Sequence, residues 1–470
     1  MKYNPNDSRS IEQYAYRLVD KTFIEVILEN ERSDDREKII AAYGNMARKG
    51  GLGNLLEEVY FGYDANNNQE ADFKEAGVEL KATPYEYNQN GEIRAGERVV
   101  ITMISYDQPF EMDFYKSHAW EKMRKMLLIY YWRNKQLNSN LLYKIGYVKM
   151  FTPPQNDLII IQQDYDFIKN KIVAGKAHEL SESDTLYLGA CTKGATAEKS
   201  TVSQYYNSRV PARKRAFCFK NSYMTFVLRH YIVGKQDIGE SVLRDMKLDT
   251  GTSFETYVAE KIDAYRGYSV EALCNEFDID MSTKPKNLGA LLAYRILGIK
   301  GNTAEEFEKA NVVVKTIRIG NNDKIKENMS FPAFKFKELI MEEWDDSTFG
   351  NYLRETRFLF VVYKFDENNV LHLKGCQFWN IPYVDLENDV KGVWEKTVDV
   401  LKGGLVVSEK NGKHYNNFPK QSENRVSHVR PHAQNAHDTY ELPDGRMYPK
   451  QCFWLNNSYI LAQLHDDLKM

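Results

Sequence analysis

The 470-residue sequence has no apolar run approaching the roughly 18–20 residues that a membrane-spanning helix needs. One of the longest runs, MLLIYYW, covers only 126–132, and the opening MKYNPNDSRS has no apolar core of the kind found in secretory signals. Cysteine is scarce as well, with five residues scattered along the chain and no CxxC pair. We therefore expect a cytoplasmic protein with reduced thiols and no membrane partner, without a disulfide framework or a zinc site.

An excess of positive charge is also missing, because 63 Lys and Arg residues face 66 Asp and Glu residues, and the formal net charge is −3. A protein that binds nucleic acid by charge alone would be strongly basic. A nuclease is compatible with this balance, since the carboxylates of a metal site offset a local basic cleft. The charge therefore neither supports nor excludes DNA as a partner.

The chain is long enough for more than one domain, and three blocks of its sequence occur twice in the same order. SIEQYAYRLVDK from Ser10 matches SFETYVAEKIDA from Ser253, GLGNLLEEVYFG matches NLGALLAYRILG, and FCFKNSYM matches FWLNNSYI, at offsets of 243, 236 and 236 residues. Chance matches would not keep order and spacing together. We predict a duplicated domain, with a first copy at 1–235, a polar linker at 236–252 and a second copy at 253–470.

Each copy has the mixed pattern of an α+β fold, in which a mixed sheet is flanked by helices. In the first copy, apolar periodicity predicts helices at about 10–29, 35–48, 51–61, 117–127 and 164–176. Alternating or β-branched runs predict strands at 76–84 and 98–106, paired with each other, and further strands at 127–132 and 185–191.

The most reactive motif is the D-x6-E-x-K spacing of Asp72, Glu79 and Lys81 in EADFKEAGVELKATP. Residues two apart on a strand point to the same face, so Glu79 and Lys81 project together, and Asp72 can turn back to meet them. Two carboxylates at one point suit Mg²⁺, which acidifies a bound water for attack on phosphorus. A lysine beside them can orient that water.

Surface strands also alternate Glu and Lys for solubility, so the spacing alone leaves a solvated face as an alternative. The apolar residues Val78 and Leu80 favour a half-buried strand instead. Glu57, near the end of an upstream amphipathic helix, can add a carboxylate, whereas Glu58 points about 100° away around that helix. We interpret a second basic face at 122–125, which includes Lys122, as surface decoration.

KGGLGNLLEEVYFG followed by ADFKEAGVELKATP resembles the active-site region of the MutH-like mismatch-repair endonucleases. KNKIVAGKAHELS, DTLYLGACTKGA and FCFKNSYMT resemble more closely the staphylococcal GATC-cutting type II restriction endonucleases, which carry two MutH-like domains in one chain. The resemblance spans nearly the whole sequence. It implies a bacterial protein with two restriction-endonuclease-like domains that cleaves double-stranded DNA at GATC.

Carried over residue by residue, the resemblance makes Asp72 and Glu79 the metal ligands, Lys81 the catalytic lysine and Glu57 the upstream catalytic glutamate, with Mg²⁺ as cofactor. Thr192 and Lys193 stand where the family has a base-reading Arg-Pro pair. The basic run RVPARKRAF favours phosphate contact. The expected DNA-binding residues of the first copy are Thr192, Lys193, Arg209, Arg213, Lys214, Arg215 and Tyr223.

The second copy lacks two of the three carboxylates, because Ala293 replaces Glu57 and Val313 replaces Glu79. Glu306 aligns with Asp72 but is not expected to hold a metal alone, and Lys315 remains in the place of Lys81. The Arg430-Pro431 pair matches the family's base-contacting pair, and Tyr459 matches Tyr223. An arginine can bond two acceptors on a guanine edge. We expect a second copy that binds DNA without cutting it, as an effector or in a homodimer on DNA.

The leading hypothesis is a Mg²⁺-dependent type II restriction endonuclease. A GATC-nicking enzyme of mismatch repair is the alternative within the same class, and its single-domain organisation argues against it here. A DNA-binding protein without catalysis is the alternative of a different class, disfavoured by the intact motif in the first copy.

Overall fold

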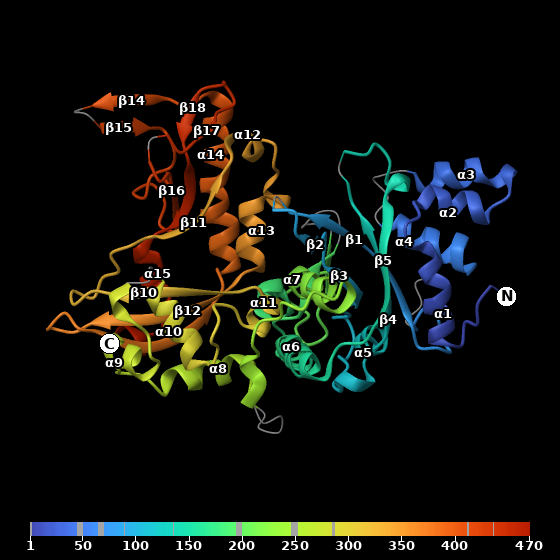
Figure 1. Ribbon diagram of the computed structural model, residues 1–470, viewed down its shortest axis with the longest axis horizontal. Coiled ribbons are helices and arrows are strands. Elements are labelled where there is room, and N and C mark those ends of the chain that lie inside the picture. Colours follow the sequence, from blue (N-terminus) through green and yellow to red (C-terminus); the bar gives the residue numbers. More distant parts are fainter. Residues whose placement is uncertain are drawn as a thin grey trace. The chain divides into compact units, whose positions relative to one another are not determined.

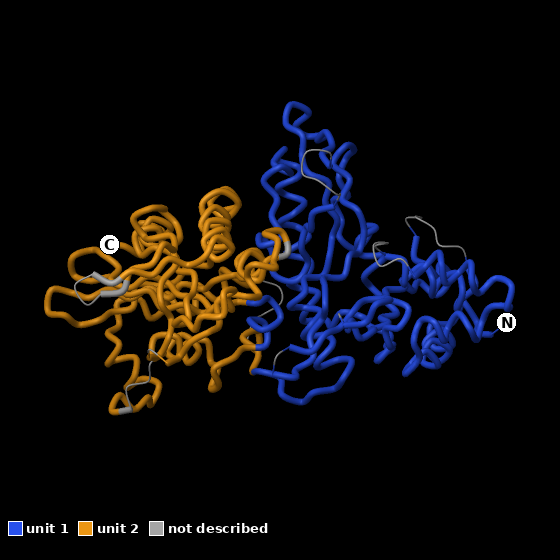
Figure 2. The backbone as a smooth tube through the Cα atoms, turned by 90° about the horizontal axis from the view of Figure 1, so that it is seen from above, with its two compact units in different colours: residues 1–239, 305–311 blue, residues 240–304, 312–470 orange. Residues whose placement is uncertain are grey.

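A computed structural model of the chain shows two compact units (Figures 1 and 2). Unit 1 comprises Met1–Gly239 and Glu305–Asn311, and unit 2 comprises Glu240–Ala304 and Val312–Met470. The long stretch of unit 1 ends inside the expected linker, but the unit also takes in a short segment from the second half. The structure describes residues 2–44, 50–63, 70–88, 90–134, 136–193, 200–245, 252–283, 287–410, 413–435 and 437–470.

Unit 1 combines helices with mixed sheets, as expected for its class. One sheet has the strand order β2-β1-β4-β5 and another the order β3-β9-β6, and β7 pairs with β8. Strands β1 and β4 are parallel, and the other neighbours are antiparallel. The helices are α1 (Ser8–Ala15), α2 (Phe23–Asn30), α3 (Ser33–Tyr43), α4 (Gly51–Leu55), α5 (His118–Met123), α6 (Gln155–Val173), α7 (Asn221–Phe226) and α11 (Glu305–Ala310). The strands are β1 (Glu79–Tyr87), β2 (Ile93–Ala95), β3 (Val99–Met103), β4 (Met126–Trp132), β5 (Lys144–Phe151), β6 (Leu188–Thr192), β7 (Thr201–Val202), β8 (Ala212–Arg213) and β9 (Arg215–Phe219).

The single helix expected at 10–29 is two helices, α1 and α2. Between them the chain turns at Asp20, whose φ of 71° lies in the left-handed region. Thr22 then starts α2 with a capping box, in which its hydroxyl accepts from the N–H of Glu25 and the Glu25 carboxylate accepts from the N–H of Thr22. The cap gives acceptors to the N–H groups of Thr22 and Glu25, which have no partner within a helix that begins here.

Strand β1 lies inside its sheet, between β2 and β4. The predicted pairing of β1 with 98–106 is wrong, because that segment forms β3 and pairs with β9. Instead β1 runs parallel to β4, with Glu79 opposite Met126. The first five residues of β4 are buried, which is typical of a strand covered on both faces and explains its nearly continuous apolar sequence.

Helix α6 begins earlier than predicted, at Gln155, and carries a buried carboxylate at Asp164. This carboxylate accepts the backbone N–H groups of Leu186, Tyr187 and Leu188 at 2.9, 2.6 and 2.9 Å. Burial raises the pKa of Asp164 to about 7, although the three donors oppose the shift. Since Leu188 opens β6, one side chain fixes where that strand begins.

Unit 2 is also a mixed α/β structure. Its sheets have the strand orders β10-β12-β13 and β11-β19-β16, and two hairpins pair β14 with β15 and β17 with β18. Strands β10 and β12 are parallel, and the other neighbours are antiparallel. The helices are α8 (Phe254–Asp263), α9 (Val270–Glu276), α10 (Leu288–Ile296), α12 (Phe336–Leu339), α13 (Thr348–Glu355), α14 (Lys391–Gly403), α15 (Asn457–Gln463) and α16 (Asp466–Lys469). The strands are β10 (Val312–Ile319), β11 (Met329–Phe334), β12 (Arg357–Phe365), β13 (Leu371–Trp379), β14 (Val407–Lys410), β15 (Lys413–Asn416), β16 (Ser427–Pro431), β17 (Thr439–Glu441), β18 (Met447–Pro449) and β19 (Gln451–Leu455).

Each unit has its own hydrophobic core. In unit 1 the N-terminal helices pack on β1 and β4, where Val78, Leu80 and Leu127 are fully or nearly fully buried. In unit 2 an aromatic cluster that includes Phe358 and Trp379 fills the space beside β12 and β13. All five cysteines are buried and free. Within the described part of the chain, no helix is both long enough and apolar enough to cross a membrane.

The Asp164 bonds predict a large loss of stability when its carboxylate is removed. Asp164→Leu leaves three buried N–H groups without an acceptor, so the free energy of unfolding should fall by at least about 3 kcal/mol, measured by urea denaturation. The control is Asp166→Ala, a half-buried residue of the same helix that pairs with Lys169, which should cost less than about 1 kcal/mol. Equal losses in the two variants would contradict this role for Asp164.

Candidate active site

The segment before β1 folds back on itself and brings Asp72 to the start of the strand. Phe73 and Val78 exchange backbone hydrogen bonds of 2.9 and 3.2 Å around a tight turn. Gly77 adopts a φ of +61° in this turn, a conformation that favours glycine. The Oδ2 atom of Asp72 accepts the N–H of Leu80 at 2.8 Å. The turn predicted from the sequence therefore places Asp72 beside β1.

Glu79 is the buried centre of the cluster, with a side chain that is 3% exposed. The Lys81 Nζ atom donates to Oε1 of Glu79 at 2.8 Å, from the same face of β1. The Lys122 Nζ atom reaches both oxygens of Glu79 at 3.1 Å. Two ammonium groups therefore contact one carboxylate that has little contact with solvent.

Two further carboxylates share this environment. Burial and then the nearby charge of Asp72 raise the pKa of Glu57 to about 7, with Lys81 opposing the shift. Burial and then Glu79 raise the pKa of Asp72, against the lowering effects of the Leu80 N–H and the two lysines. Three carboxylates around two lysines leave an excess of negative charge, which favours either a proton or a bound cation.

Glu57 reaches the cluster from a helix with an unusual turn. Helix α4 continues into a π-helical turn at Leu56–Phe61, and Glu57 lies at its start. The neighbouring Glu58 is exposed and instead accepts a hydrogen bond from the hydroxyl of Tyr43. Asp72 and Glu79 are both among the charges that raise the pKa of Glu57, so this side chain belongs to the cluster.

Tyr63, which follows this helix, brings a phenol to the same place. A hollow of about 460 Å³ lies beside the cluster, and both Tyr63 and Asp72 line it. The hydroxyl of Tyr63 is buried and has no hydrogen-bond partner within the part of the chain that the structure describes. Burial and then Asp72 and Glu57 raise the pKa of this phenol, so it stays a hydrogen-bond donor.

The structure brings together the four expected catalytic residues and adds Lys122. Our interpretation of Lys122 as surface decoration is wrong, because the residue is 9% exposed and bonded to Glu79. Lys122 lies in the last turn of α5, directly before β4. Parallel pairing of β4 with β1 carries it to Glu79, so the contact spans 43 residues of sequence. A helix-face pattern cannot reveal such a partner.

The expected DNA-binding residues of unit 1 divide into exposed and buried groups. Thr192 is exposed at the end of β6, Lys193 follows it half-buried, and the rest of the loop at 194–199 lies outside the described residues. Arg215 is 6% exposed and donates to the carbonyl of Ala190 at 2.6 Å, so this prediction of a phosphate contact does not fit the structure. The remaining three side chains are exposed or half-buried on the same segment, namely Arg209, Arg213 and Lys214.

The two expected DNA-contacting tyrosines are both interior. Tyr223 is fully buried and its hydroxyl donates to Asp157 at 3.0 Å. Tyr459 is 5% exposed and its hydroxyl donates to Asp385 at 2.8 Å. A direct contact of either ring with DNA does not fit this arrangement. Their hydroxyls instead complete buried hydrogen bonds, which a polar tip on a large apolar ring usually does.

In unit 2, the expected base-reading pair is accessible. Arg430 and Pro431 end β16 with exposed side chains, and the guanidinium of Arg430 lies 5.3 Å from the ring centroid of Trp454. By contrast, Lys315 on β10 forms no ion pair among the described residues, and burial alone lowers its pKa. The apolar Ala293 and the partly buried Val313 occupy the aligned carboxylate positions.

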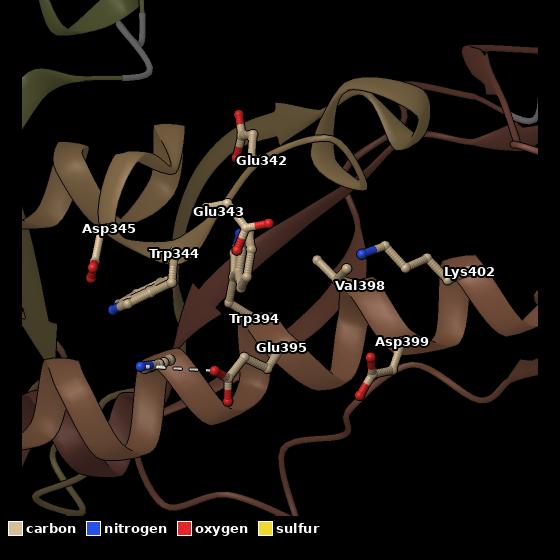
Figure 3. Close-up of a pocket in the computed structure, with 10 residues that line it drawn as sticks. Glu342, Glu343, Trp344, Asp345, Trp394, Glu395, Val398, Asp399 and Lys402 are labelled. Carbon is tan, nitrogen blue, oxygen red and sulfur yellow. Dashed lines mark ion pairs between the residues drawn. The ribbon is translucent and has the colours of Figure 1, made fainter. Parts of the chain in front are cut away.

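Unit 2 also has an acidic pocket of about 310 Å³, which the sequence did not suggest (Figure 3). It lies between α14 and the segment before α13. Acidic side chains outnumber the lysines in its walls, which is unfavourable for contact with phosphate. The lining residues are Glu342, Glu343, Trp344, Asp345, Lys391, Trp394, Glu395, Val398, Asp399 and Lys402.

Comparison with known proteins gives matches of two kinds. The family profile of the DNA mismatch repair enzyme MutH matches residues 61–164, which include Asp72, Glu79, Lys81 and Lys122. The type II restriction enzyme Sau3AI of Staphylococcus aureus is 37% identical over 459 residues, which cover 89% of this chain and 93% of that protein.

Mismatch repair proteins MutH are similar over a smaller part of the chain. The protein of Shewanella sp. (strain W3-18-1) is 25% identical over 181 residues, which cover 38% of this chain and 78% of that protein. The protein of Vibrio parahaemolyticus is 23% identical over 235 residues, which cover 49% of this chain and 98% of that protein.

The raised pKa of Glu57 predicts a pH-dependent stability of the metal-free protein. Between its ordinary value of 4.5 and the folded value of about 7, the folded state keeps a proton that the unfolded chain releases. Protonated Glu57 therefore makes its full contribution to the free energy of unfolding below pH 4.5, and this contribution is lost as the pH rises through 7. Glu57→Gln should flatten this decline and melt at a higher temperature than the wild type at pH 8 in EDTA.

The matched control for this measurement is Glu58→Gln, because Glu58 is the exposed neighbour on the same helical turn. Its melting temperature should follow that of the wild type across the pH range. If the profiles of Glu57→Gln and the wild type run parallel from about pH 5 to pH 8, Glu57 does not titrate as described.

Proposed function

The chain belongs to the family of the type II restriction enzyme Sau3AI and is a site-specific deoxyribonuclease, and from that premise we propose that it cleaves double-stranded DNA at GATC by Mg²⁺-dependent hydrolysis. The observation that carries the proposal is the buried cluster around Glu79 in unit 1. The five free, buried cysteines suit the reducing cytoplasm of a bacterium, where such an enzyme would meet its DNA.

The residues of the cluster fit a hard divalent cation. Asp72 and Glu79 would hold it, since their carboxylates share a buried site and the pKa of Asp72 is raised by burial and by Glu79. Among the described residues, no three acidic, histidine or cysteine side chains converge to hold a metal by themselves. Mg²⁺ commonly keeps several waters and needs only one or two carboxylates, so two ligands are sufficient.

When bound, a divalent cation would acidify a water and neutralise charge on the scissile phosphate. The chain's own residues do the rest. Lys81 and Lys122 fix both oxygens of Glu79 and hold positive charge where negative charge develops. Glu57, the third carboxylate of the cluster, would take a proton from the attacking water.

We further propose that unit 2 is a second copy of unit 1 that binds DNA without cutting it. The order β1-β4-β5 in unit 1 parallels β10-β12-β13 in unit 2, and in both cases the first pair is parallel and the second antiparallel. Similarly, β3-β9-β6 parallels β11-β19-β16. With Ala293 and Val313 in the positions of Glu57 and Glu79, unit 2 would act as an effector through the exposed Arg430 and Pro431, with a second GATC site or a second protomer.

The exposed residues of unit 1 that the sequence assigned to DNA remain candidates for contact. Thr192 and Lys193 follow β6 as base-reading candidates, and Arg209, Arg213 and Lys214 are candidates for phosphate contact. Tyr223, Tyr459 and Arg215 leave this set because they are buried.

A GATC nickase of the mismatch-repair type is the second candidate, supported by the MutH profile match. The nickase hypothesis explains a smaller part of the sequence. The similarity to the MutH relatives covers 38% and 49% of the chain, whereas the similarity to the restriction enzyme covers 89%. A DNA-binding protein without catalysis leaves the cluster around Glu79 unexplained.

The proposal predicts Mg²⁺-dependent cutting of a GATC-containing plasmid. The wild type should give linear fragments with 5′-GATC ends in Mg²⁺ and no cleavage in EDTA. Glu79→Ala removes a proposed ligand and should slow cleavage by more than about 100-fold. The control Glu70→Ala, an exposed residue nearby that pairs with Lys74, should cut at the wild-type rate.

Each outcome of the plasmid assay decides between the candidates. Open circles as the final product would identify the nickase, and binding without cleavage would identify the non-catalytic alternative. Cleavage by Glu79→Ala at the wild-type rate would show that the site is elsewhere.

The exposed position of Arg430 predicts a specific loss of DNA binding by unit 2. In a Glu79→Ala background that prevents cutting, Arg430→Ala should weaken binding of a GATC duplex by roughly 5- to 150-fold, the range of one bidentate base contact. Binding should fall steeply with salt in every variant, because phosphate contacts release counterions. The control is Arg318→Ala, an exposed arginine of unit 2 paired with Glu327. Equal effects of the two substitutions would contradict base reading by Arg430.

A further inference from the structure

Helix α11 belongs to one unit while the chain on both sides of it belongs to the other. Residues 240–304 and 312–470 form unit 2, but Glu305–Asn311 lie in unit 1. Figure 1 shows α11 beside α6 and α7, and contacts with α7 hold it there. Phe307 and Ala310 are buried at 2% and 0% exposure. The second half of the chain thus contributes a helix to the fold of the catalytic unit.

The central contact of α11 is a buried ion pair. Lys309 is 2% exposed, and its Nζ atom bonds Asp157 of α6 at 2.5 Å and Glu305 of its own helix at 2.6 Å. The same ammonium lies 4.7 Å from the ring centroid of Phe226 on α7. At the rim, Arg229 lies 3.7 Å from the carboxylate of Glu308. Opposite charges are therefore paired at the centre of this contact and at its edge.

Asp157 depends on this lysine. It is 2% exposed, and its other oxygen accepts the hydroxyl of Tyr223 at 3.0 Å. Burial raises the pKa of Asp157, and Lys309 is the largest influence that lowers it. Removing the lysine alone would leave a buried carboxylate with a single neutral donor, which is strongly unfavourable.

Unit 2 contains the same aspartate–tyrosine pair with a different cation. Asp385 accepts the hydroxyl of Tyr459, and Arg425 supplies the positive charge. Arg425 is an exposed residue of unit 2 itself. In unit 1, by contrast, the cation that pairs with the aspartate is Lys309 of α11, and the chain before and after α11 belongs to unit 2.

The connection from α11 to the first strand of unit 2 is one residue long. Helix α11 ends at Ala310, Asn311 turns the chain with a φ of 52°, and Val312 at once pairs with Arg357 in the sheet of unit 2. In unit 1, Gly77 makes the corresponding left-handed turn before β1. A single residue therefore separates the helix in unit 1 from the first strand of the sheet in unit 2.

We propose that α11 is a docking helix that couples the two halves, with Lys309–Asp157 as its anchor and Asn311 as its one-residue joint to β10. It carries the effect of DNA bound by unit 2 to helices α6 and α7 of the catalytic unit. The anchor stands on the contacts alone, whereas the coupling rests on the proposed effector function of unit 2.

Lys309→Met in the full chain tests the anchor. Hydrogen exchange should rise in peptides at 155–173 and 221–232 while peptides at 391–403 stay unchanged, and the melting temperature should fall by about 10 °C. The matched control Arg425→Met removes the exposed cation of unit 2 and should leave exchange at 155–173 and 221–232 as in the wild type. Lys309→Met/Asp157→Asn removes both buried charges and should recover most of the loss. Unchanged exchange in Lys309→Met, or no recovery in the double variant, would overturn the anchor.

A four-glycine insertion between Asn311 and Val312 tests the joint with the anchor intact. The melting temperature and the exchange at 221–232 should stay as in the wild type. The rate of cutting two-site DNA relative to one-site DNA should fall to about one. An unchanged ratio would overturn the coupling. If the wild type itself shows no two-site stimulation, the effector function and the coupling both fail, while the Lys309→Met result still decides the anchor.

Discussion

The buried Glu79 carboxylate, fixed by ammonium groups from Lys81 and Lys122, is the interaction on which the rest of the site depends. A carboxylate with almost no solvent needs compensating charge, and here Asp72 and Glu57 add more negative charge than two lysines balance. The surrounding fold serves this arrangement. The parallel pairing of β1 with β4 delivers one lysine, the turn at Gly77 delivers Asp72, and the π-helical turn delivers Glu57.

The sequence predicted the local part of this site but not its long-range part. Asp72, Glu79 and Lys81 lie within one turn and one strand, so their spacing is enough to bring them together. Lys122 comes from a helix 43 residues away, and no periodicity reveals the strand pairing that places it. The mixed α/β class followed from hydrophobic patterns, whereas the partner of β3 did not, because sheet order depends on contacts between distant segments.

Burial is the second property that local patterns could not supply. Arg215 opens β9, the central strand of its sheet, and all five residues of that strand are buried. A basic run therefore ends inside the protein, although its earlier members Arg209 and Lys214 are exposed. Tyr223 and Tyr459 are likewise interior, each with its hydroxyl on an aspartate. The segments 70–84 and 304–318, which align Glu79 with Val313 and Lys81 with Lys315, also differ in structure. The first carries Asp72 to the site, and the start of the second forms α11 in unit 1.

The most direct test of a metal site at Glu79 is a crystal structure of the full chain with a GATC duplex and Ca²⁺, a hard cation that takes oxygen ligands. We expect density for a cation roughly 2.3–2.6 Å from oxygens of Asp72 and Glu79, against a DNA phosphate, and no cation beside Val313 and Lys315 of unit 2. A complex in which DNA is bound but no cation contacts Asp72 or Glu79, or in which the cation lies in unit 2, would contradict the central claim.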